Sequence, residues 1–185
     1  GQVQQLDDPE AGVTYTGPMA VMVNRLSASA SEIFAGAMQD YGRALVIGES
    51  TFGKGTVQSI QPLNHGELKL TLAKFYRVSG QSTQHRGVVP DIRYPSLLDS
   101  EEIGESALPN AMPWDTIPPA RYQTSSHLQP FIAQLQQQHE ARAAKDPDFI
   151  YTLARIGLDN QIKARETIPL NEEKRKQQQE DYENR

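Results

Sequence analysis

The chain has 185 residues, of which 37% are hydrophobic and 22% charged, enough for one main core with an appendage but not for several domains. Its 18 Lys and Arg against 23 Asp and Glu give a net charge of −5, so no positive field attracts a nucleic-acid backbone and we expect no nucleic-acid partner. The absence of cysteine excludes disulfides and thiolate sites, and the apolar runs are far shorter than the roughly 20 residues of a membrane span.

The first part of the chain has the pattern of a strand-helix-strand unit. Residues 1–12 are polar and aperiodic, which is typical of a surface loop. The apolar run 19–23 predicts a buried parallel strand, and residues 44–47 predict a second one. Between them, apolar residues recur at helical spacing from Ser29, and Gly42 provides a stop signal. This order predicts an α/β layer architecture with a right-handed crossover. The predicted apolar stripe of the helix consists of Ala30, Ile33, Phe34, Ala37, Met38 and Tyr41.

A glycine-punctuated loop and a hairpin are predicted next. The loop covers residues 48–55. Segments 56–63 and 68–78 alternate like strands, and residues 64–66 between them have the composition of a turn. These features indicate an antiparallel hairpin.

The composition changes near residue 95. Most of the glycines lie before this position, and Gln, Lys, Arg and Glu become frequent after it. We therefore predict three regions: a core over residues 1–95, a proline-rich surface connector over 96–125 and a helical region over 126–185. In the last region, residues 128–144 and 148–165 have helical periodicity, and 171–185 read as a solvated, mixed-charge helix or a frayed end.

A serine cluster over residues 27–32 lies where the first strand turns into the helix, a place where open α/β sheets carry functional groups. A serine there meets unpaired backbone N–H groups and the positive end of the helix dipole, which can stabilise an oxyanion. The small residues Ala28 and Ala30 leave Ser29 sterically open. The structural alternative is an N-cap, because Ser29 followed by Glu32 is a capping box.

Lys54 has a glycine on each side, Gly53 and Gly55, and Phe52 nearby. Such glycines allow close backbone packing, and a lysine packed against apolar groups can accept a proton at neutral pH. Lys54 could therefore activate a serine. The structural alternative is an ordinary exposed loop lysine.

A nucleotide site is disfavoured, although residues 48–54 match the G-x-x-x-x-G-K part of a P-loop. Gly55 stands where the motif needs the Ser or Thr that binds magnesium, and the following residues read as a strand rather than a helix.

A histidine triad is disfavoured as well. Of His65, His85, His127 and His139, only His85 lies near the motifs, and no spacing argument brings it or Asp91 to Ser29. No cluster has metal-ligand spacing, so we expect neither a metal nor a cofactor.

Taken together, the segments 24–44, 48–58 and 87–92 resemble the C-terminal processing (tail-specific) peptidases. Residues 139–149 resemble the helical extension of the long periplasmic Prc-type branch of this family. The resemblance implies an α/β fold with a layered strand-helix peptidase core of the crotonase/Clp-like superfamily and an α-helical C-terminal extension.

The resemblance further implies a serine endopeptidase of Ser-Lys type that works through an acyl-enzyme. Ser29 would be the nucleophile, Lys54 the general base and Gln58 the residue that orients the lysine. The N–H of Ala30 is the expected oxyanion donor, and Asp40 is expected to be structural. In an extended strand the backbones of Lys54 and Gln58 would lie roughly 13 Å apart, so Gly55 must bend the chain for them to meet.

The family also has features that this chain lacks, namely a PDZ module and a glycine-rich strand upstream of the serine. Gly1 therefore looks like the start of a fragment whose apolar sheet edges need another part of the protein. The resemblance implies protein substrates with apolar C-termini, the PDZ-bearing part and an adaptor lipoprotein as partners, and a periplasmic location. The alternative from another class is a catalytically silent binding or scaffold domain of the same fold.

Overall fold

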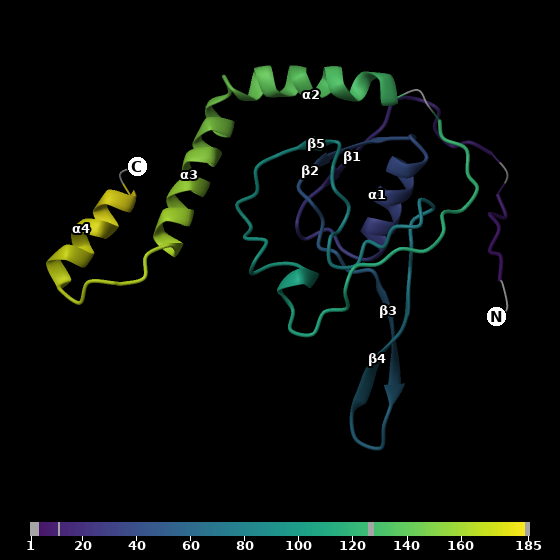
Figure 1. Ribbon diagram of the computed structural model, residues 1–185, viewed down its shortest axis with the longest axis horizontal. Coiled ribbons are helices and arrows are strands. Elements are labelled where there is room, and N and C mark those ends of the chain that lie inside the picture. Colours follow the sequence, from purple (N-terminus) through teal and green to yellow (C-terminus); the bar gives the residue numbers. More distant parts are fainter. Residues whose placement is uncertain (1–3, 11, 126–127, 184–185) are drawn as a thin grey trace.

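The computed structural model describes residues 4–10, 12–125 and 128–183, and Figure 1 shows a strand-helix core from which a helical arm extends. This architecture confirms the predicted α/β class with an α-helical C-terminal extension. His127, one of the four histidines considered above, lies outside the described residues.

A parallel three-stranded sheet forms the centre of the core. Strands β1 (Ala20–Val23), β2 (Leu45–Gly48) and β5 (Ile92–Arg93) pair in the order β1-β2-β5. Helix α1 (Ala30–Asp40) connects β1 and β2, as the sequence predicts. Gly42 follows the helix with φ 63°, a left-handed conformation that glycine adopts at low cost.

Helix α1 packs against the sheet through small residues. Ala35 is fully buried and belongs to the core cluster with Val23 and Val46, and Glu32 is buried beside it. Small side chains let the helix approach the strands closely, so the large apolar residues are left on the outer side. The predicted stripe is therefore wrong: Ala30, Ile33, Phe34 and Tyr41 are exposed, and Ala37 and Met38 are half-buried.

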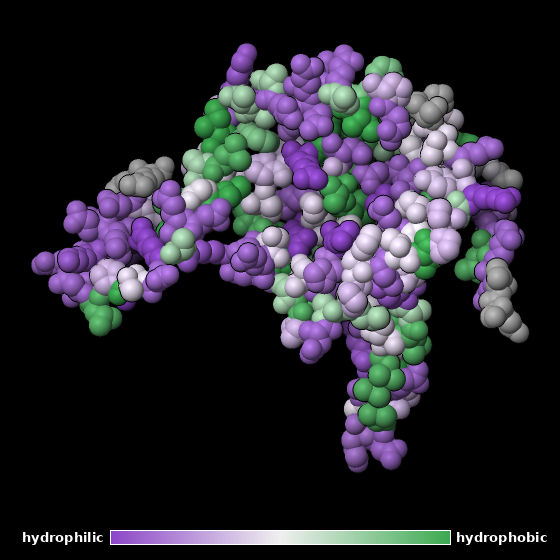
Figure 2. Space-filling model, in the orientation of Figure 1, coloured by the Kyte–Doolittle hydropathy of each residue, from purple (hydrophilic) through white to green (hydrophobic). Residues whose placement is uncertain are grey.

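Strands β3 (Thr56–Pro62) and β4 (Glu67–Lys74) form the predicted antiparallel hairpin as a separate two-stranded sheet. The hairpin projects from the core in Figure 1, and Figure 2 shows hydrophobic side chains along its length. Strand β4 ends at Lys74 rather than at residue 78, because the chain there turns back to pair Tyr76 with Ser82.

The C-terminal arm consists of helices α2 (Gln129–Ala143), α3 (Pro147–Lys163) and α4 (Glu172–Glu183). Helix α2 crosses one end of the core and contacts β5. The buried ring of His139 lies 4.7 Å from the ring of Tyr94 and 5.6 Å from that of Phe149, so an aromatic cluster joins the arm to the core. No helix of the described residues is long and apolar enough to cross a membrane.

The connector between core and arm is more than the surface loop that its prolines predict. It contains the short 3-10 helix η1 (Glu105–Ala107), and the Glu105 side chain is buried. Arg25, which is 7% exposed, donates to the carbonyl oxygens of Ile103 and Ser100 and to the Ser106 hydroxyl. The connector therefore packs against the core and provides hydrogen-bond acceptors for a buried arginine.

Candidate active site

Ser29 occupies the turn from β1 into α1 with an unusual backbone conformation, φ 57° and ψ −112°. It forms the predicted capping box with Glu32, and its N–H donates to Glu32 Oε2 at 2.8 Å. An N-cap residue ordinarily has an extended conformation. A positive φ in a residue other than glycine is costly and concentrates at functional sites. Capping alone does not require this backbone, so the conformation favours a functional role for Ser29.

Glu32 is the buried centre of the site. Its carboxylate is fully buried and accepts four hydrogen bonds. Oε2 accepts from the N–H of Ser29 and, at 2.9 Å, from the N–H of Lys54. Oε1 accepts from the N–H of Gly53 at 2.7 Å and from the hydroxyl of Thr51. One carboxylate thus ties the start of α1 to the loop that carries Lys54.

Ser29 and Lys54 are brought together by this arrangement. Their backbone nitrogens bond to the same oxygen atom, which keeps the two nitrogens within about 6 Å of each other. Both residues are half-buried. A further backbone hydrogen bond, from Phe52 N to Ser27 O at 2.9 Å, fixes the same two segments side by side.

Close backbone packing explains the two glycines that flank Lys54. Gly53 has φ 92°, and a Cβ added there would lie 2.9 Å from the carbonyl carbon of His85. A Cβ on Gly55 would lie 2.6 Å from Gln84 N, and the buried Gln84 side chain accepts from the Gly55 N–H at 2.8 Å. The loop can therefore hold its conformation only with glycine at these positions.

Thr51 and Arg25 hold the loop that carries Lys54 in place, and no sequence pattern pointed to either of them. The fully buried Thr51 hydroxyl donates to Glu32 and accepts from Val88 N at 2.7 Å. The Arg25 guanidinium donates to the Thr51 carbonyl oxygen at 2.8 Å. A polar residue in a loop gives no periodic signal, and only the position of Thr51 three residues before Lys54 could have drawn attention to it.

Gln58 and Ala30 lie at the edge of the site. Gln58 is exposed and follows a β-bulge between Val57 and Gln58, a feature that is frequent beside active sites. Its side chain has no hydrogen-bond partner among the residues that the structure describes. The exposed Ala30 is the first residue of α1, and its N–H has no backbone acceptor in the described chain.

None of the three described histidines, His65, His85 and His139, has a side-chain hydrogen bond to Ser29. The N–H of His85 donates to Gly53 O at 2.7 Å, so this residue lies beside the lysine loop, with an exposed side chain. Asp91 is bound elsewhere, by Val46 N and by the Gln39 side chain. In the described part of the chain, no group of three His, Cys, Asp or Glu residues could hold a metal ion.

Asp40 has the structural role that the sequence analysis expected. It forms a bidentate ion pair with Arg77, at 2.6 Å from Nη2 to Oδ1 and 2.9 Å from Nε to Oδ2. The side chains of Arg77 and Asp40 are only 14% and 10% exposed. The pair joins the end of α1 to the chain beyond β4. Without Arg77, the negative end of the helix dipole would disfavour the negative charge of Asp40.

Arg77→Ala is expected to reduce the free energy of unfolding by about 3 kcal/mol, because it leaves the Asp40 carboxylate shielded from water without its partner. Urea unfolding of the full-length protein measures this. Lys176→Ala is the matched control: its pair with Glu172 is 70% and 80% exposed, and we expect a change below about 0.5 kcal/mol. Equal effects of the two substitutions would contradict this assignment.

Comparisons with known proteins match both parts of the chain. The model of peptidase family S41 matches residues 2–94, and a model described as the C-terminal domain of tail specific protease matches residues 98–185. The tail-specific protease of Haemophilus influenzae is 43% identical over 182 residues, which are 92% of this chain and 26% of that protein. The carboxy-terminal-processing protease of Bartonella bacilliformis is 50% identical over 91 residues, 49% of this chain and 21% of its own length.

A solved structure, described as photosystem II D1 C-terminal processing protease, has 43% sequence identity and a TM-score of 0.39, and the match covers 41% of this chain and 20% of that one. The chain spans about a quarter of the length of its Haemophilus relative and about a fifth of its Bartonella relative. The two family models and the two sequence relatives confirm the resemblance inferred from the motifs. Since the family model covers half of the chain, including Ser29 and Lys54, the chain belongs to peptidase family S41.

Proposed function

We propose that this chain carries the catalytic residues of a serine endopeptidase of Ser-Lys type, which processes or degrades proteins recognised by their apolar C-terminal tails. One observation carries the proposal: a single buried carboxylate oxygen, Glu32 Oε2, binds the backbone N–H groups of both Ser29 and Lys54. The strained backbone of Ser29 supports the same role.

In the proposed reaction, the Lys54 amine takes the proton of Ser29 Oγ, and the oxygen attacks the carbonyl carbon of the scissile peptide bond. The unpaired N–H of Ala30 stabilises the oxyanion. The C–N bond then breaks, Lys54 returns its proton to the leaving amine, and Ser29 keeps the acyl group as an ester. Lys54 next activates a water molecule that hydrolyses the ester. Gln58, which lies just after the bulge, orients the lysine.

The wider setting is proposed from the family resemblance. Protein substrates would reach the site through a PDZ-bearing part of the same protein, and an adaptor lipoprotein would deliver some of them. The expected location is the periplasm. The division into a core over residues 1–95, a connector over 96–125 and a helical region over 126–185 stays a prediction. A catalytically silent scaffold domain is the second candidate. In that case the capping box of Ser29 and Glu32 would be the whole role of Ser29.

Covalent labelling distinguishes the enzyme from the scaffold. The full-length protein is incubated with a fluorophosphonate probe, which reacts with activated serine hydroxyls and not with ordinary capping serines. We expect a single probe adduct on Ser29, and cleavage of an unfolded peptide that ends in apolar residues. The same peptide ending in two aspartates is expected to be cut more slowly. A protein that neither reacts with the probe nor cleaves either peptide would support the scaffold instead.

A further inference from the structure

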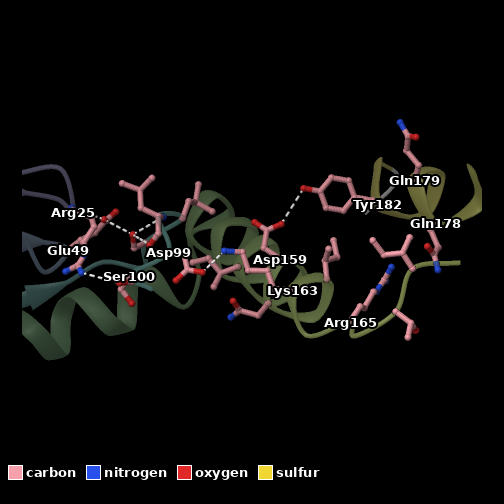
Figure 3. A pocket seen from close by; sticks show the side chains of 18 of the residues that line it. Arg25, Glu49, Asp99, Ser100, Asp159, Lys163, Arg165, Gln178, Gln179 and Tyr182 are labelled. Atoms are coloured by element: carbon pink, nitrogen blue, oxygen red, sulfur yellow. Dashed lines mark hydrogen bonds and ion pairs between the residues drawn. The ribbon is translucent and has the colours of Figure 1, made fainter. Parts of the chain in front are cut away.

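A cavity of about 1170 Å³ separates the core from the helical arm. Its walls are the ends of β2 and β5, the connector near residue 98, and helices α3 and α4. Figure 3 shows the lining side chains in a row from Arg25 and Glu49 on the core to Tyr182 on α4. The cavity lies apart from Ser29 and Lys54, neither of which lines it.

The carboxylates of this cavity are already engaged within the chain. Four line it, those of Glu49, Asp99, Asp159 and Glu172, and each accepts a hydrogen bond from a neighbour: Ser96, Lys163, Tyr182 and Lys176, respectively. The ion pair with Lys163 also lowers the pKa of Asp99, so this carboxylate stays charged and occupied. Lys163 and Lys176 therefore offset the charges of Asp99 and Glu172, whereas Glu49 and Asp159 accept from neutral hydroxyls and keep their negative charge.

The arginines of the cavity are in the opposite situation. Arg93 from β5, Arg165 from just after α3 and Arg175 from α4 all line it, and all three are exposed. Among the described residues, none of these three guanidinium groups has a carboxylate partner or a side-chain hydrogen bond. These three unpaired arginines outnumber the two carboxylates without an ion-pair partner, Glu49 and Asp159, so the uncompensated charge of the lining is positive in balance.

Exposed apolar side chains line the same cavity. Leu97 is 56% exposed, Ile168 67% and Leu170 95%, and all three line the cavity. A wall that combines large exposed apolar residues with uncompensated charge is more typical of a protein-binding surface than of a surface that stays in contact with solvent. Its complement is a segment with both apolar side chains and carboxylates.

We propose that this cavity is the docking site for an acidic amphipathic segment of a partner protein. The apolar side chains of the segment would cover Leu97, Ile168 and Leu170, and its carboxylates would pair with Arg93, Arg165 and Arg175. A basic segment of the same shape would be repelled, which gives the site its selectivity. This inference does not depend on the peptidase activity.

The cavity also reaches the start of the loop that carries Lys54. Gly48, Glu49 and Ser50, which begin this loop, line it together with Arg25. Arg25 in turn holds the carbonyl oxygen of Thr51, whose hydroxyl bonds to Glu32. A docked segment would therefore lie beside Arg25, which supports the loop of the candidate active site.

Fluorescence anisotropy tests the proposal with a labelled 14-residue helical peptide of Leu, Glu and Ala, in which leucines line one face. The full-length protein carries Ser29→Ala in every sample, so cleavage cannot distort the binding curve. We expect saturable binding that weakens with added salt, and no comparable binding of the peptide in which Gln replaces each Glu. The double variant Arg165→Glu/Arg175→Glu should weaken binding by at least about tenfold.

A matched double variant, Arg121→Glu/Lys69→Glu, carries the same change of charge outside the cavity and should bind as the parent does. Leu170→Ser tests the apolar part independently, and because Leu170 is 95% exposed its replacement should not disturb folding. Three results would overturn the proposal: no binding at about 1 mM protein, equal binding of the Glu peptide and the Gln peptide, or an equal loss of affinity in both double variants. Failure of the probe adduct on Ser29 would leave this result unaffected.

Discussion

Ser29→Ala is expected to lower kcat/KM for an unfolded peptide by about 10³-fold to 10⁶-fold, because it removes the oxygen that attacks the peptide bond. Lys54→Met should lose activity to a similar extent, since it keeps the length of the side chain but removes the proton acceptor. The two residues are expected to act as one unit. The double variant should therefore be no slower than the slower single variant.

The controls separate catalysis from folding. Lys69→Met makes the same chemical change in an exposed lysine of β4 and should leave cleavage unchanged. Both residues of the proposed dyad are half-buried, so we expect each single variant to keep its unfolding transition nearly unchanged. Losses that multiply in the double variant would contradict a Ser-Lys unit. Full activity of Lys54→Met would assign the role of base to another residue.

The strand-helix-strand unit and the hairpin could be predicted because their signals are local. Apolar runs, a helical spacing and Gly42 fix the order of β1, α1 and β2 without knowledge of the rest of the chain. The glycines beside Lys54 also drew attention to the loop that packs beside the start of α1. The reason for them, contact with the backbone of Gln84 and His85, depends on residues about thirty positions away.

The buried polar network could not be predicted for the same reason. Glu32 has the sequence signature of a helix cap, and its capping bond to Ser29 exists, but three of its four donors come from the loop at residues 51–54. A buried carboxylate on α1 also changes which side of the helix faces the core. That is why the apolar stripe through Ile33 and Phe34 gave the wrong buried face.

Glu32→Ala is expected to be the most destabilising single substitution at the site. It leaves the N–H groups of Ser29, Gly53 and Lys54 and the Thr51 hydroxyl without their acceptor, in a place where the side chain of Glu32 is fully buried. Each unsatisfied buried donor costs about 1–3 kcal/mol before relaxation, so we expect a loss of about 3–5 kcal/mol in the free energy of unfolding. Urea unfolding of the full-length protein measures this loss.

Glu32→Gln is the sharper test, because it keeps the shape and replaces only one acceptor oxygen by an amide. If the remaining oxygen faces Ser29 N and Lys54 N, the new NH₂ group faces the N–H of Gly53, donor against donor. We expect a loss of about 1–3 kcal/mol in stability, together with a fall in kcat at temperatures where the variant is fully folded. The rate of probe labelling at Ser29 should fall in parallel, while KM stays near the parent value. A variant that loses stability but keeps kcat and the labelling rate would show that Glu32 only holds the fold, and that the shared oxygen has no part in positioning Ser29 and Lys54.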